Sequence, residues 1–457
     1  MSSQRILVWG MAVAGEAVAR AAHRRGWSVV AADDTVSDAG RRAAAEMGIE
    51  LIEAPDGPAL DALVRGVDVV SPSPGVPEHH RLITTALSAG VALRTELDLA
   101  YEWEQLRPGG PRPMVTITGT DGKTTVTTLA TAMVNASGRK GIDAGNTDLP
   151  LVSALDSDAD VFVIEATSFR LRWLTRFRSK SATWLNLAPD HLDWHGDVDR
   201  YVAAKARVFE FQRADDVAIG FADDPIVMDA LRAARARHVT FGRAGTPADY
   251  FERDGILHGP RGPIVAVDEL WRSFPHDRTN ALAAAATVLE AGVATIDGVR
   301  RALREFRGIA HRIMLVAEAD GVRYYDDSKA TTPHAAVTAI RGFDSVVLIA
   351  GGRNKALDLS TMAVEPGRMR AVVAIGDSAP DVARAFSGIC PVTIAGSMDD
   401  AVRTARDVAR PGDSVLLSPG CASFDWYRNY GERGDDFARA ARELAGHAAN
   451  DATGGEQ

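Results

Sequence analysis

Cysteine is scarce in this chain of 457 residues. Cys390 and Cys421 are its two cysteines, so it can form at most one disulfide bond. This excludes a small disulfide-stabilised scaffold and predicts a protein of the reducing cytoplasm. Long hydrophobic runs are also missing, because no window of about 18 residues is both apolar and uncharged, which excludes a membrane-spanning helix.

An excess of positive charge is lacking too. The chain has 51 Lys and Arg against 61 Asp and Glu, a formal net charge of -10 at pH 7. That balance argues against nonspecific binding to nucleic acid or to an anionic membrane, and leaves open a local basic pocket for an anionic metabolite. With 46% hydrophobic and 25% charged residues, the composition is that of a folded globular protein. The length predicts about three domains.

Strand-like and helical segments alternate along the whole chain. The strand-like segments are continuous apolar runs, which strands need when helices cover both faces of a parallel sheet. We therefore predict an α/β fold with mainly parallel sheets. The predicted strands are 6–8, 28–31, 67–70, 114–117, 161–164, 314–316, 346–349, 372–375 and 415–417.

Two breaks in this alternation predict domain boundaries. Residues 107–113 hold three prolines and two glycines, which cannot continue a helix, and a buried strand follows at once. A second boundary is expected near 306–312, between a helical pattern and the next strand. The predicted domains are 1–107, 108–309 and 310–457.

The most specific motif follows the strand predicted at 114–117. It reads Gly-Thr-Asp-Gly-Lys-Thr-Thr over residues 119–125 and leads into a helix. In such a loop the backbone N–H groups at the helix start bind phosphate, the lysine reaches the outer phosphates and the threonine hydroxyl reaches Mg²⁺. Ile117 stands where the longer form of this loop has its first glycine. The order of strand, glycines, Lys-Thr pair and helix favours a nucleotide site over a fortuitous glycine-rich turn.

Carboxylate, histidine and lysine side chains follow in the same region. Glu165 ends a predicted strand and can hold the Mg²⁺ of a nucleotide, although an isolated strand-end glutamate is more often structural. Residues 186–195 (Asn-Leu-Ala-Pro-Asp-His-Leu-Asp-Trp-His) hold four acid-base or metal-binding groups within six residues. The i, i+4 spacing of His191 and His195 suggests zinc, but no HExxH pattern or cysteine cluster accompanies it. Lys205 lies in a helical stretch, where an isolated lysine is typically at the surface.

In the first predicted domain, polar turns follow three strands. Gly10 and Gly15 are five residues apart, a weak form of the dinucleotide turn GxGxxG. Asp34 and Thr35 close the second strand, where acidic groups either meet a ribose or base or are simply solvated. Residues 73–75 (Ser-Pro-Gly) make a rigid turn at the carboxyl edge of the sheet, which is where open α/β sheets bind ligands.

The last third of the chain repeats this arrangement in three turns. They span 326–333 (Asp-Asp-Ser-Lys-Ala-Thr-Thr-Pro), 351–355 (Gly-Gly-Arg-Asn-Lys) and 418–425 (Ser-Pro-Gly-Cys-Ala-Ser-Phe-Asp). Their polar side chains are either helix caps or ligands for phosphate and carboxylate. Because the carboxyl ends of parallel strands meet at one edge, we expect the three turns to converge on one site.

Together, these motifs resemble the Mur ligase family of ATP-dependent amide-forming enzymes. Its GTNGKTT loop matches 119–125, NxxxDHLDxH matches 186–195, DSKATNP matches 327–333 and SPxxASFD matches 418–425. The resemblance spans nearly the whole chain. It implies a Rossmann-like UDP-sugar domain, a central P-loop ATPase domain and a Rossmann-like C-terminal domain that receives an amino acid.

The glutamate-adding member of the family is the one that the sequence looks like. The resemblance implies ATP-dependent ligation of D-glutamate to UDP-N-acetylmuramoyl-L-alanine through an acyl phosphate, in cytoplasmic peptidoglycan precursor synthesis. It also implies ATP, two Mg²⁺ ions and a lysine carbamate as cofactors, and a monomer. Two alternatives stay open: a ligase that adds L-glutamate or another amino acid, and a nucleotide-sugar-binding homologue with weakened catalysis.

The resemblance further implies roles for individual residues. The implied catalytic groups are Lys123, Glu165, His191 and Lys205, and the implied metal ligands are Thr124, Glu165, His191 and Lys205 as its carbamate. The implied ATP contacts are Gly119, Thr120, Asp121, Gly122, Lys123, Thr124, Thr125, Asn280, His311, Arg312, Asp327 and Lys329. The implied UDP-substrate contacts are Val13, Asp34, Thr35, Ser73, Gly75 and Asn146, and the implied glutamate contacts are Thr331, Lys355, Ser423 and Tyr430.

The chain departs from the family pattern beside several of these residues. Asp121 replaces an Asn in the P-loop, and its carboxylate should weaken nucleotide binding unless it is protonated or bound to metal. Residues 165–171 read EATSFRL where the family has ELSSFQL, and Asp277 replaces the first Asn of HNxxN. We interpret these changes as lineage drift or altered substrate choice. Further departures are Asp148 in the NIG segment, Thr332 in KATNP and Ser37 near the expected uracil.

Overall fold

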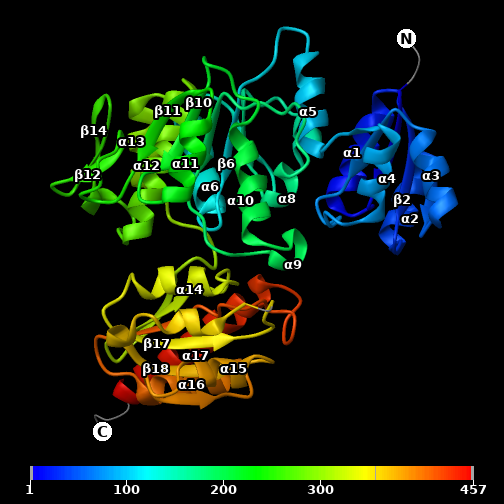
Figure 1. Ribbon diagram of the computed structural model, residues 1–457. Helices are drawn as coiled ribbons and strands as arrows, with labels where there is room; N and C mark the ends of the chain where they lie inside the picture. Colours follow the sequence, from blue (N-terminus) through cyan, green and yellow to red (C-terminus); the bar gives the residue numbers. More distant parts are fainter. Residues whose placement is uncertain (1–3, 356, 454–457) are drawn as a thin grey trace. The chain divides into compact units, whose positions relative to one another are not determined.

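Residues 4–355 and 357–453 are described by a computed structural model, which has an α/β fold with mostly parallel sheets (Figure 1). The chain divides into two compact units after Phe306, next to the boundary expected near 306–312. Within the described residues, no helix combines the length and the apolar character needed to cross a membrane.

The first sheet contains the first strands of the chain. Its elements are β1 (Arg5–Trp9), α1 (Val13–Arg24), β2 (Ser28–Asp33), α2 (Asp38–Met47), β3 (Glu50–Glu53), α3 (Gly57–Arg65), β4 (Val69–Pro72), α4 (Arg81–Ala89), β5 (Ala92–Leu93) and α5 (Glu96–Gln105). The strand order is β3-β2-β1-β4-β5, and all pairs are parallel. In β1, Leu7 and Trp9 pack into one core and Ile6 and Val8 into the other. This burial on both faces explains why the strand is a continuous apolar run.

β4 begins two residues later than the strand predicted at 67–70. Asp68 belongs to the preceding turn, where its Oδ2 accepts a hydrogen bond of 2.8 Å from the backbone N–H of Arg5. The carboxylate thus ties the turn before β4 to the start of β1, so Asp68 is part of the connection and not of the strand.

The second sheet starts after the proline-rich segment 107–113. Its elements are β6 (Met114–Thr118), α6 (Lys123–Ala136), β7 (Gly141–Gly145), α7 (Leu151–Ala154), β8 (Val161–Glu165), α8 (Ser168–Leu171), β9 (Ser181–Trp184), α9 (Leu192–His195), α10 (Val198–Ala206), η1 (Arg207–Phe209), β10 (Val217–Phe221), α11 (Pro225–Ala233), β11 (Arg237–Phe241), β12 (Phe251–Arg253), β13 (Ile256–Gly259), β14 (Gly262–Ala266), η2 (Val267–Glu269), α12 (Pro275–Glu290) and α13 (Ile296–Glu305). The order β11-β10-β9-β6-β8-β7 is parallel throughout, as predicted. β12, β13 and β14 form a separate antiparallel sheet.

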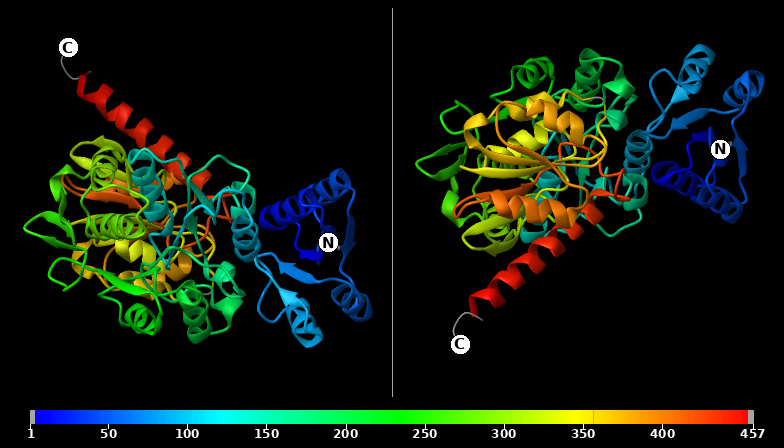
Figure 2. Two further views of the ribbon diagram at one scale, coloured as in Figure 1. Left: turned by 90° about the horizontal axis from the view of Figure 1, so that it is seen from above. Right: turned by 90° about the horizontal axis from the view of Figure 1, so that it is seen from below.

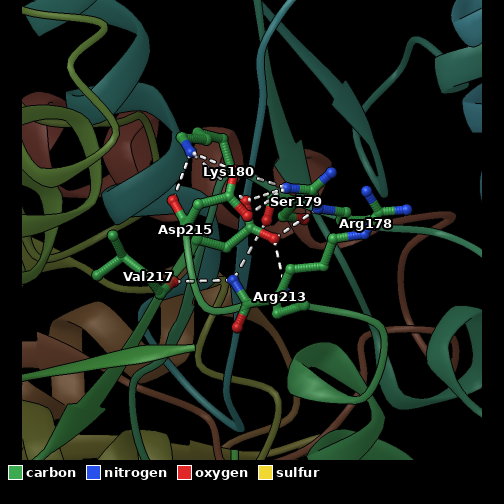
Figure 3. A network of polar contacts seen from close by, with 8 residues as sticks. Arg178, Ser179, Lys180, Arg213, Asp215 and Val217 are labelled. Atoms are coloured by element: carbon green, nitrogen blue, oxygen red, sulfur yellow. Dashed lines mark hydrogen bonds and ion pairs between the residues drawn. The ribbon is translucent and has the colours of Figure 1, made fainter. Parts of the chain in front are cut away.

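A polar network joins the segments that lead into β9 and β10 (Figure 3). Arg178 Nε lies 2.5 Å from Oδ2 of Asp216, whose side chain is buried. Gln212 Nε2 donates to the backbone carbonyls of Ser179 at 3.2 Å and Val217 at 2.8 Å. In a parallel sheet, the ends where strands begin lie opposite the loop that follows β6. The network therefore stabilises the sheet at the edge away from that loop.

The second unit contains one further sheet. Its elements are β15 (Met314–Ala319), β16 (Val322–Asp326), α14 (Pro333–Ile340), β17 (Val346–Gly351), η3 (Leu359–Ala363), η4 (Pro366–Arg368), β18 (Met369–Ile375), α15 (Ala379–Ala385), β19 (Val392–Ile394), α16 (Met398–Val408), β20 (Ser414–Leu417) and α17 (Tyr430–Thr453). The order is β15-β16-β20-β17-β18-β19, and within this sheet only the β15–β16 pair of the described strands is antiparallel. α17 is the long red helix of Figure 2.

Candidate functional site

The loop between β6 and α6 has the form of a phosphate cradle. Gly122 precedes α6 with a φ of +82°, and a Cβ atom there would lie 2.8 Å from Asn280 Oδ1, so glycine is required. Lys123 Nζ donates to the carbonyl oxygens of Gly119 at 2.9 Å and Thr120 at 2.8 Å, which folds its side chain over the loop. Gly122 brings no side-chain cap to α6, and a helix start of this kind is suited to bind an anion such as phosphate.

Asn186, two residues after the end of β9, holds this loop in shape. Its Oδ1 accepts hydrogen bonds from the backbone N–H groups of Thr120 at 3.0 Å and Asp121 at 2.9 Å, and its Nδ2 donates to the Asp121 carbonyl at 3.1 Å. The Thr120 hydroxyl contacts the Ala188 carbonyl and the Tyr201 hydroxyl, each at 3.1 Å. Asn186 and Tyr201 are therefore part of the site although neither was predicted as a ligand residue. The motif 186–195 was the signal in the sequence that could have identified Asn186.

Lys205 is buried beside the loop, with 1% of its surface exposed, so it is not the surface lysine typical of an isolated helix position. Its Nζ donates to the Gly119 carbonyl at 2.7 Å and lies 4.7 Å from the centre of the Tyr201 ring. Burial, which disfavours the ammonium form, together with the nearby charge of Lys123, holds the pKa of Lys205 well below its ordinary value. Three carboxylates within electrostatic range oppose this shift of the pKa: Asp190, Asp121 and Glu165.

Glu165 ends β8 at the same edge of the sheet, because β8 pairs with β6 in the register Glu165 to Ile117. Its side chain is 2% exposed, and Oε1 accepts a hydrogen bond of 2.9 Å from Asn146 Nδ2. Oε2 is buried and has no hydrogen-bond partner among the described residues. A buried carboxylate oxygen in this position needs a cation or a donor from a ligand. Glu165 is therefore suited to hold a divalent metal ion next to the loop.

His191 lies at the turn before α9 with a left-handed φ of +53°. Its Nε2 is 3.2 Å from Asp190 Oδ2, and its ring packs edge-on against Phe169, with 4.6 Å between the ring centres. The backbone N–H of His191 also donates to Asp190 Oδ1 at 2.9 Å. His195 is turned elsewhere, because both of its ring nitrogens contact other side chains. Despite their spacing, the two histidines do not face a shared zinc site.

Within the described residues, no group of three or more His, Cys, Asp or Glu side chains forms a ready metal cluster. A metal ion at Glu165 would thus take few ligands from the protein. Mg²⁺ bound to a nucleotide commonly has one or two protein carboxylates, with phosphate oxygens and waters completing its shell. The donors present fit a nucleotide-bound Mg²⁺ better than a structural metal.

The turn between β1 and α1 packs tightly against Ser73. Gly10 has a φ of +89°, and a Cβ atom there would lie 2.9 Å from Ser73, while one on Gly15 would lie 1.7 Å from the Gly10 carbonyl. The Ser73 hydroxyl donates to that carbonyl at 2.7 Å. The two glycines are thus required by packing within the chain, whether or not a phosphate binds there.

The other residues expected to contact the UDP substrate lie near the carboxyl ends of β1, β2 and β4, which are neighbours in the first sheet. Asp34 Oδ2 accepts from Trp9 Nε1 at 3.3 Å and lies 2.9 Å from His80 Nε2. Val13, Thr35 and Gly75 are exposed. Asn146 is set apart from them, since it follows β7 and contacts Glu165.

Two departures from the family pattern have partners in this chain. The Arg170 guanidinium forms a buried ion pair of 2.7 Å with Glu96, from α5. Asp277 forms a two-armed ion pair with Arg272, at 2.7 and 2.8 Å. Each substituted residue therefore has a charge-neutralising partner, which explains how it is accommodated.

In the second unit, β16, β20 and β17 are adjacent and parallel, so the turns at 326–333, 418–425 and 351–355 lie along one edge of the sheet. The Ser418 hydroxyl donates to Asp327 Oδ2 at 2.7 Å, which joins two of these turns. Lys329 Nζ lies 5.2 Å from the centre of the Tyr430 ring. The predicted residues differ in burial: Ser423 is buried, Thr331 is half-buried, and Lys355 and Tyr430 are exposed.

Arg433, from α17, was not predicted from the sequence and connects two of these turns. Its guanidinium is 1% exposed and donates to the Ser328 hydroxyl and carbonyl and to the Cys421 carbonyl, at 2.8 to 3.2 Å. Burial lowers the pKa of Arg433 to about 10. The next residue must be small, because a Cβ on Gly434 would lie 2.2 Å from Nδ1 of His311. That nitrogen is itself 2.7 Å from Asp326 Oδ2.

Comparison with known proteins agrees with this architecture. The model of the Mur ligase middle domain matches residues 117–270, and that of the Mur ligase glutamate ligase domain matches residues 311–421. Among solved structures, a pseudomurein peptide ligase type C from Methanothermus fervidus has the same fold, with a TM-score of 0.60. It is 16% identical and covers 97% of this chain and 100% of its own.

Curated relatives are closer in sequence. A UDP-N-acetylmuramoylalanine–D-glutamate ligase from Frankia casuarinae is 42% identical over 96% of this chain and 94% of its own length. One from Desulfosudis oleivorans is 36% identical over 97% of both. With this identity over nearly the full length of both chains, and with a P-loop, a buried lysine and a strand-end glutamate in one site, the chain belongs to the Mur ligase family.

Proposed function

We propose that this chain is an ATP-dependent ligase that joins D-glutamate to UDP-N-acetylmuramoyl-L-alanine in peptidoglycan precursor synthesis. The full-length similarity to curated D-glutamate ligases carries the proposal. The geometry supports it, because the P-loop, Glu165 and Lys205 form one buried polar site of the kind that phosphoryl transfer needs. By family resemblance and low cysteine content, we propose a monomer in the cytoplasm.

ATP would bind with its phosphates on the loop 119–125. Lys123 would neutralise charge on the outer phosphates, and Thr124 would hold the first Mg²⁺. The remaining proposed ATP contacts are Asn280 in the first unit and His311, Arg312, Asp327 and Lys329 in the second. The proposed substrate contacts are Val13, Asp34, Thr35, Ser73, Gly75 and Asn146 for the nucleotide sugar and Thr331, Lys355, Ser423 and Tyr430 for glutamate.

Glu165, His191 and Lys205 are the proposed holders of two Mg²⁺ ions. The buried Oε2 of Glu165 fits a cation, and the lowered pKa of Lys205 favours the neutral, nucleophilic form of its amine. Attack of that amine on CO₂ forms an N–C bond, releases one proton and leaves a carbamate anion, which can hold metal where an ammonium cannot. Bound Mg²⁺ supplies charge neutralisation for the transferring phosphoryl group.

The reaction then follows from the groups present. The terminal alanine carboxylate attacks the γ-phosphorus of ATP, ADP leaves, and an acyl phosphate forms. The amine of glutamate attacks the acyl carbon, the C–O bond to phosphate breaks, and an amide forms. The amine must lose a proton, for which His191 or Asp190 is the proposed acceptor. If His191 holds metal, Asp190 takes this role.

A phosphate-release assay tests the proposal. The purified protein is given UDP-N-acetylmuramoyl-L-alanine, ATP and Mg²⁺, with D-glutamate, L-glutamate or no amino acid. We expect phosphate release that needs D-glutamate and is lost in the Lys123→Ala variant. Preference for L-glutamate would assign the chain to an L-specific ligase, and no glutamate-dependent release would contradict ligase function.

Asp121 favours one other function, a nucleotide-sugar-binding homologue with weakened catalysis. Its backbone is fixed in the phosphate loop by Asn186, so its carboxylate lies near the expected phosphates. Like charges repel, and the Asp121→Asn variant should therefore bind ATP more tightly than the unmodified protein. Titration calorimetry with ATP and Mg²⁺ measures this. Equal affinity of the two proteins would remove the argument for weakened nucleotide binding.

A further inference from the structure

His195 lies between the first predicted domain and the second. Its side chain has 0% of its surface exposed, and each ring nitrogen has one polar partner. Nδ1 is 3.0 Å from Oε1 of Glu78, and Nε2 is 2.9 Å from the hydroxyl of Ser168. Glu78 belongs to the loop between β4 and α4, whereas Ser168 starts α8 in the second domain.

The chemistry of the two partners determines the state of the ring. An ionised carboxylate can only accept a hydrogen bond, so Nδ1 of His195 must carry the proton that Glu78 accepts. Nε2 then has a lone pair that accepts from the Ser168 hydroxyl. Burial lowers the pKa of His195, which favours this neutral form. The imidazole thus donates a hydrogen bond from Nδ1 to Glu78 of the first predicted domain and accepts one at Nε2 from Ser168 of the second.

Glu78 is held in place on its own side. Its side chain is 7% exposed, and Arg172 Nε lies 2.8 Å from the same Oε1, as an ion pair without the angle of a hydrogen bond. Glu78 is three residues from Gly75, in the loop that begins with the Ser-Pro-Gly turn at 73–75. A shift of Glu78 would therefore move the turn expected to contact the nucleotide sugar.

On the other side, His195 contacts the residues around the phosphate site. Ser168 follows Glu165 by three residues. The rings of His195 and Tyr201 are 5.3 Å apart, and the Tyr201 hydroxyl contacts Thr120 of the P-loop. Phe169 stacks on His195 with 8° between the ring planes. Movement of the imidazole would thus be transmitted to the P-loop and to Glu165.

We propose that His195 and Glu78 are positioning residues that set the distance between the sugar-nucleotide turn at 73–75 and the phosphoryl-transfer site at 119–125. The inference rests on the proposed function. A nucleotide sugar that binds the first domain must present its carboxylate to a phosphate held by the second, so a fixed domain contact lowers the cost of aligning them. The Glu78–His195 hydrogen bond provides that contact in the buried part of the boundary.

The experiment measures the partial reaction, the burst of ADP from ATP and UDP-N-acetylmuramoyl-L-alanine without glutamate. In Glu78→Ala the burst rate should fall by about tenfold to a hundredfold, the cost of a misplacement of about 1 Å. The KM for glutamate should stay unchanged, since the proposed glutamate contacts all belong to the second unit. Glu78→Gln keeps an oxygen that can accept from Nδ1, so it should recover most of the rate.

Two further variants separate positioning from simple stability. His195→Asn retains a hydrogen-bond donor near the position of Nδ1 but loses the contact to Ser168. In the double variant with Glu78→Ala, the burst rate should fall by less than the product of the two single reductions. Asp156→Asn is the matched control, because Asp156 forms an exposed ion pair with Arg24 between the same two domains. This control should react like the unmodified protein.

The outcomes are distinct. An unmodified protein without any burst contradicts the proposed function itself. If the unmodified protein is active and folded Glu78→Ala keeps its full burst rate, the inference is wrong. The inference is also wrong if the kinetic constants of the variants fall only in proportion to their folded fraction, measured by thermal unfolding. Glu78 would then be needed for stability alone.

Discussion

Lys205 shows how burial changes the chemistry of a single side chain. In the sequence it is one lysine in an amphipathic helix, a position that normally carries a solvated charge. In the folded chain it donates to the Gly119 carbonyl from a site closed to solvent, with Lys123 nearby. A neutral amine in that position is a nucleophile, which a surface lysine at neutral pH is not.

Removal of this amine should stop the reaction. We expect Lys205→Ala to lose activity by about 100-fold or more, the scale of losing one preorganised charge-stabilising group. If a carbamate is the working form, short carboxylic acids should restore part of the activity, because they supply an oxygen anion in the vacated space. The phosphate-release rate with and without acetate measures this. Full activity of the variant would contradict the assignment.

The buried His195 predicts a pH dependence of stability. Its pKa is lowered in the folded chain, so below the ordinary value of about 6.5 the unfolded state binds more protons than the folded state. The free energy of unfolding should therefore fall as the pH drops from about 6.5 toward the lowered pKa. His195→Gln has no titrating ring and should lose less stability over that range. Urea unfolding of both proteins at pH 7.5 and 5.5 tests the difference, and equal losses would contradict it.

At the scale of elements, the two ends of the second sheet carry different kinds of side chains. The loops after β6, β8 and β9 carry the P-loop, Glu165 and the segment 186–195, whereas the segments that enter β9 and β10 carry the network of Figure 3. The sheet thus has the groups proposed to bind ligands where its strands end and the ion pairs where its strands begin. Substitutions at the end where β9 and β10 begin should change the free energy of unfolding without changing the KM values of the substrates.

Asp216 provides the test at that edge. Its side chain is 0% exposed and pairs with Arg178, so Asp216→Ala leaves a partly buried guanidinium without this partner. We expect the free energy of unfolding to fall by about 3 kcal/mol, while the KM values stay unchanged. Asp215→Ala is the control, because that side chain is 69% exposed and its solvent-screened ion pair with Arg178 should contribute little to the free energy of unfolding. Urea unfolding separates the two, and a changed KM in Asp216→Ala would argue against a purely structural role.

At the scale of the whole molecule, side-chain contacts explain how residues that differ from the family pattern are accommodated. Arg170 replaces the glutamine of the family pattern. Its guanidinium forms a buried ion pair with Glu96, from α5. Asp277 pairs with Arg272, a contact between residues only five positions apart. These pairs explain why the two substitutions are tolerated, and they give no sign of a changed substrate.

The Arg170–Glu96 pair, which joins the first and second predicted domains, can be tested as a unit. Arg170→Gln restores the family residue but leaves the Glu96 carboxylate buried without its cation, so we expect a loss of about 3 kcal/mol in the free energy of unfolding. Glu96→Gln combined with Arg170→Gln removes both charges and should cost less than Arg170→Gln alone. Denaturant unfolding of the three proteins measures this coupling. A double variant less stable than Arg170→Gln would show that the ion pair is not what accommodates Arg170.

The amino-acid sequence was enough to predict the fold class, the phosphate loop and the family, because these depend on local order: strand, glycines, Lys-Thr and helix, and apolar runs buried on both faces. The roles of the individual site residues remain proposals. The tertiary structure was needed to show the burial of Lys205, the different contacts of His191 and His195, the buried contacts of Arg433, and the partners of Arg170 and Asp277. Burial depends on contacts between segments far apart in the chain, and so does the pairing of Arg170 with Glu96, so no local pattern encodes them. The Arg272–Asp277 pair, by contrast, joins residues only five positions apart. The scarcity of cysteine is consistent with this, since buried ion pairs and hydrogen bonds join the segments and no disulfide bond is formed.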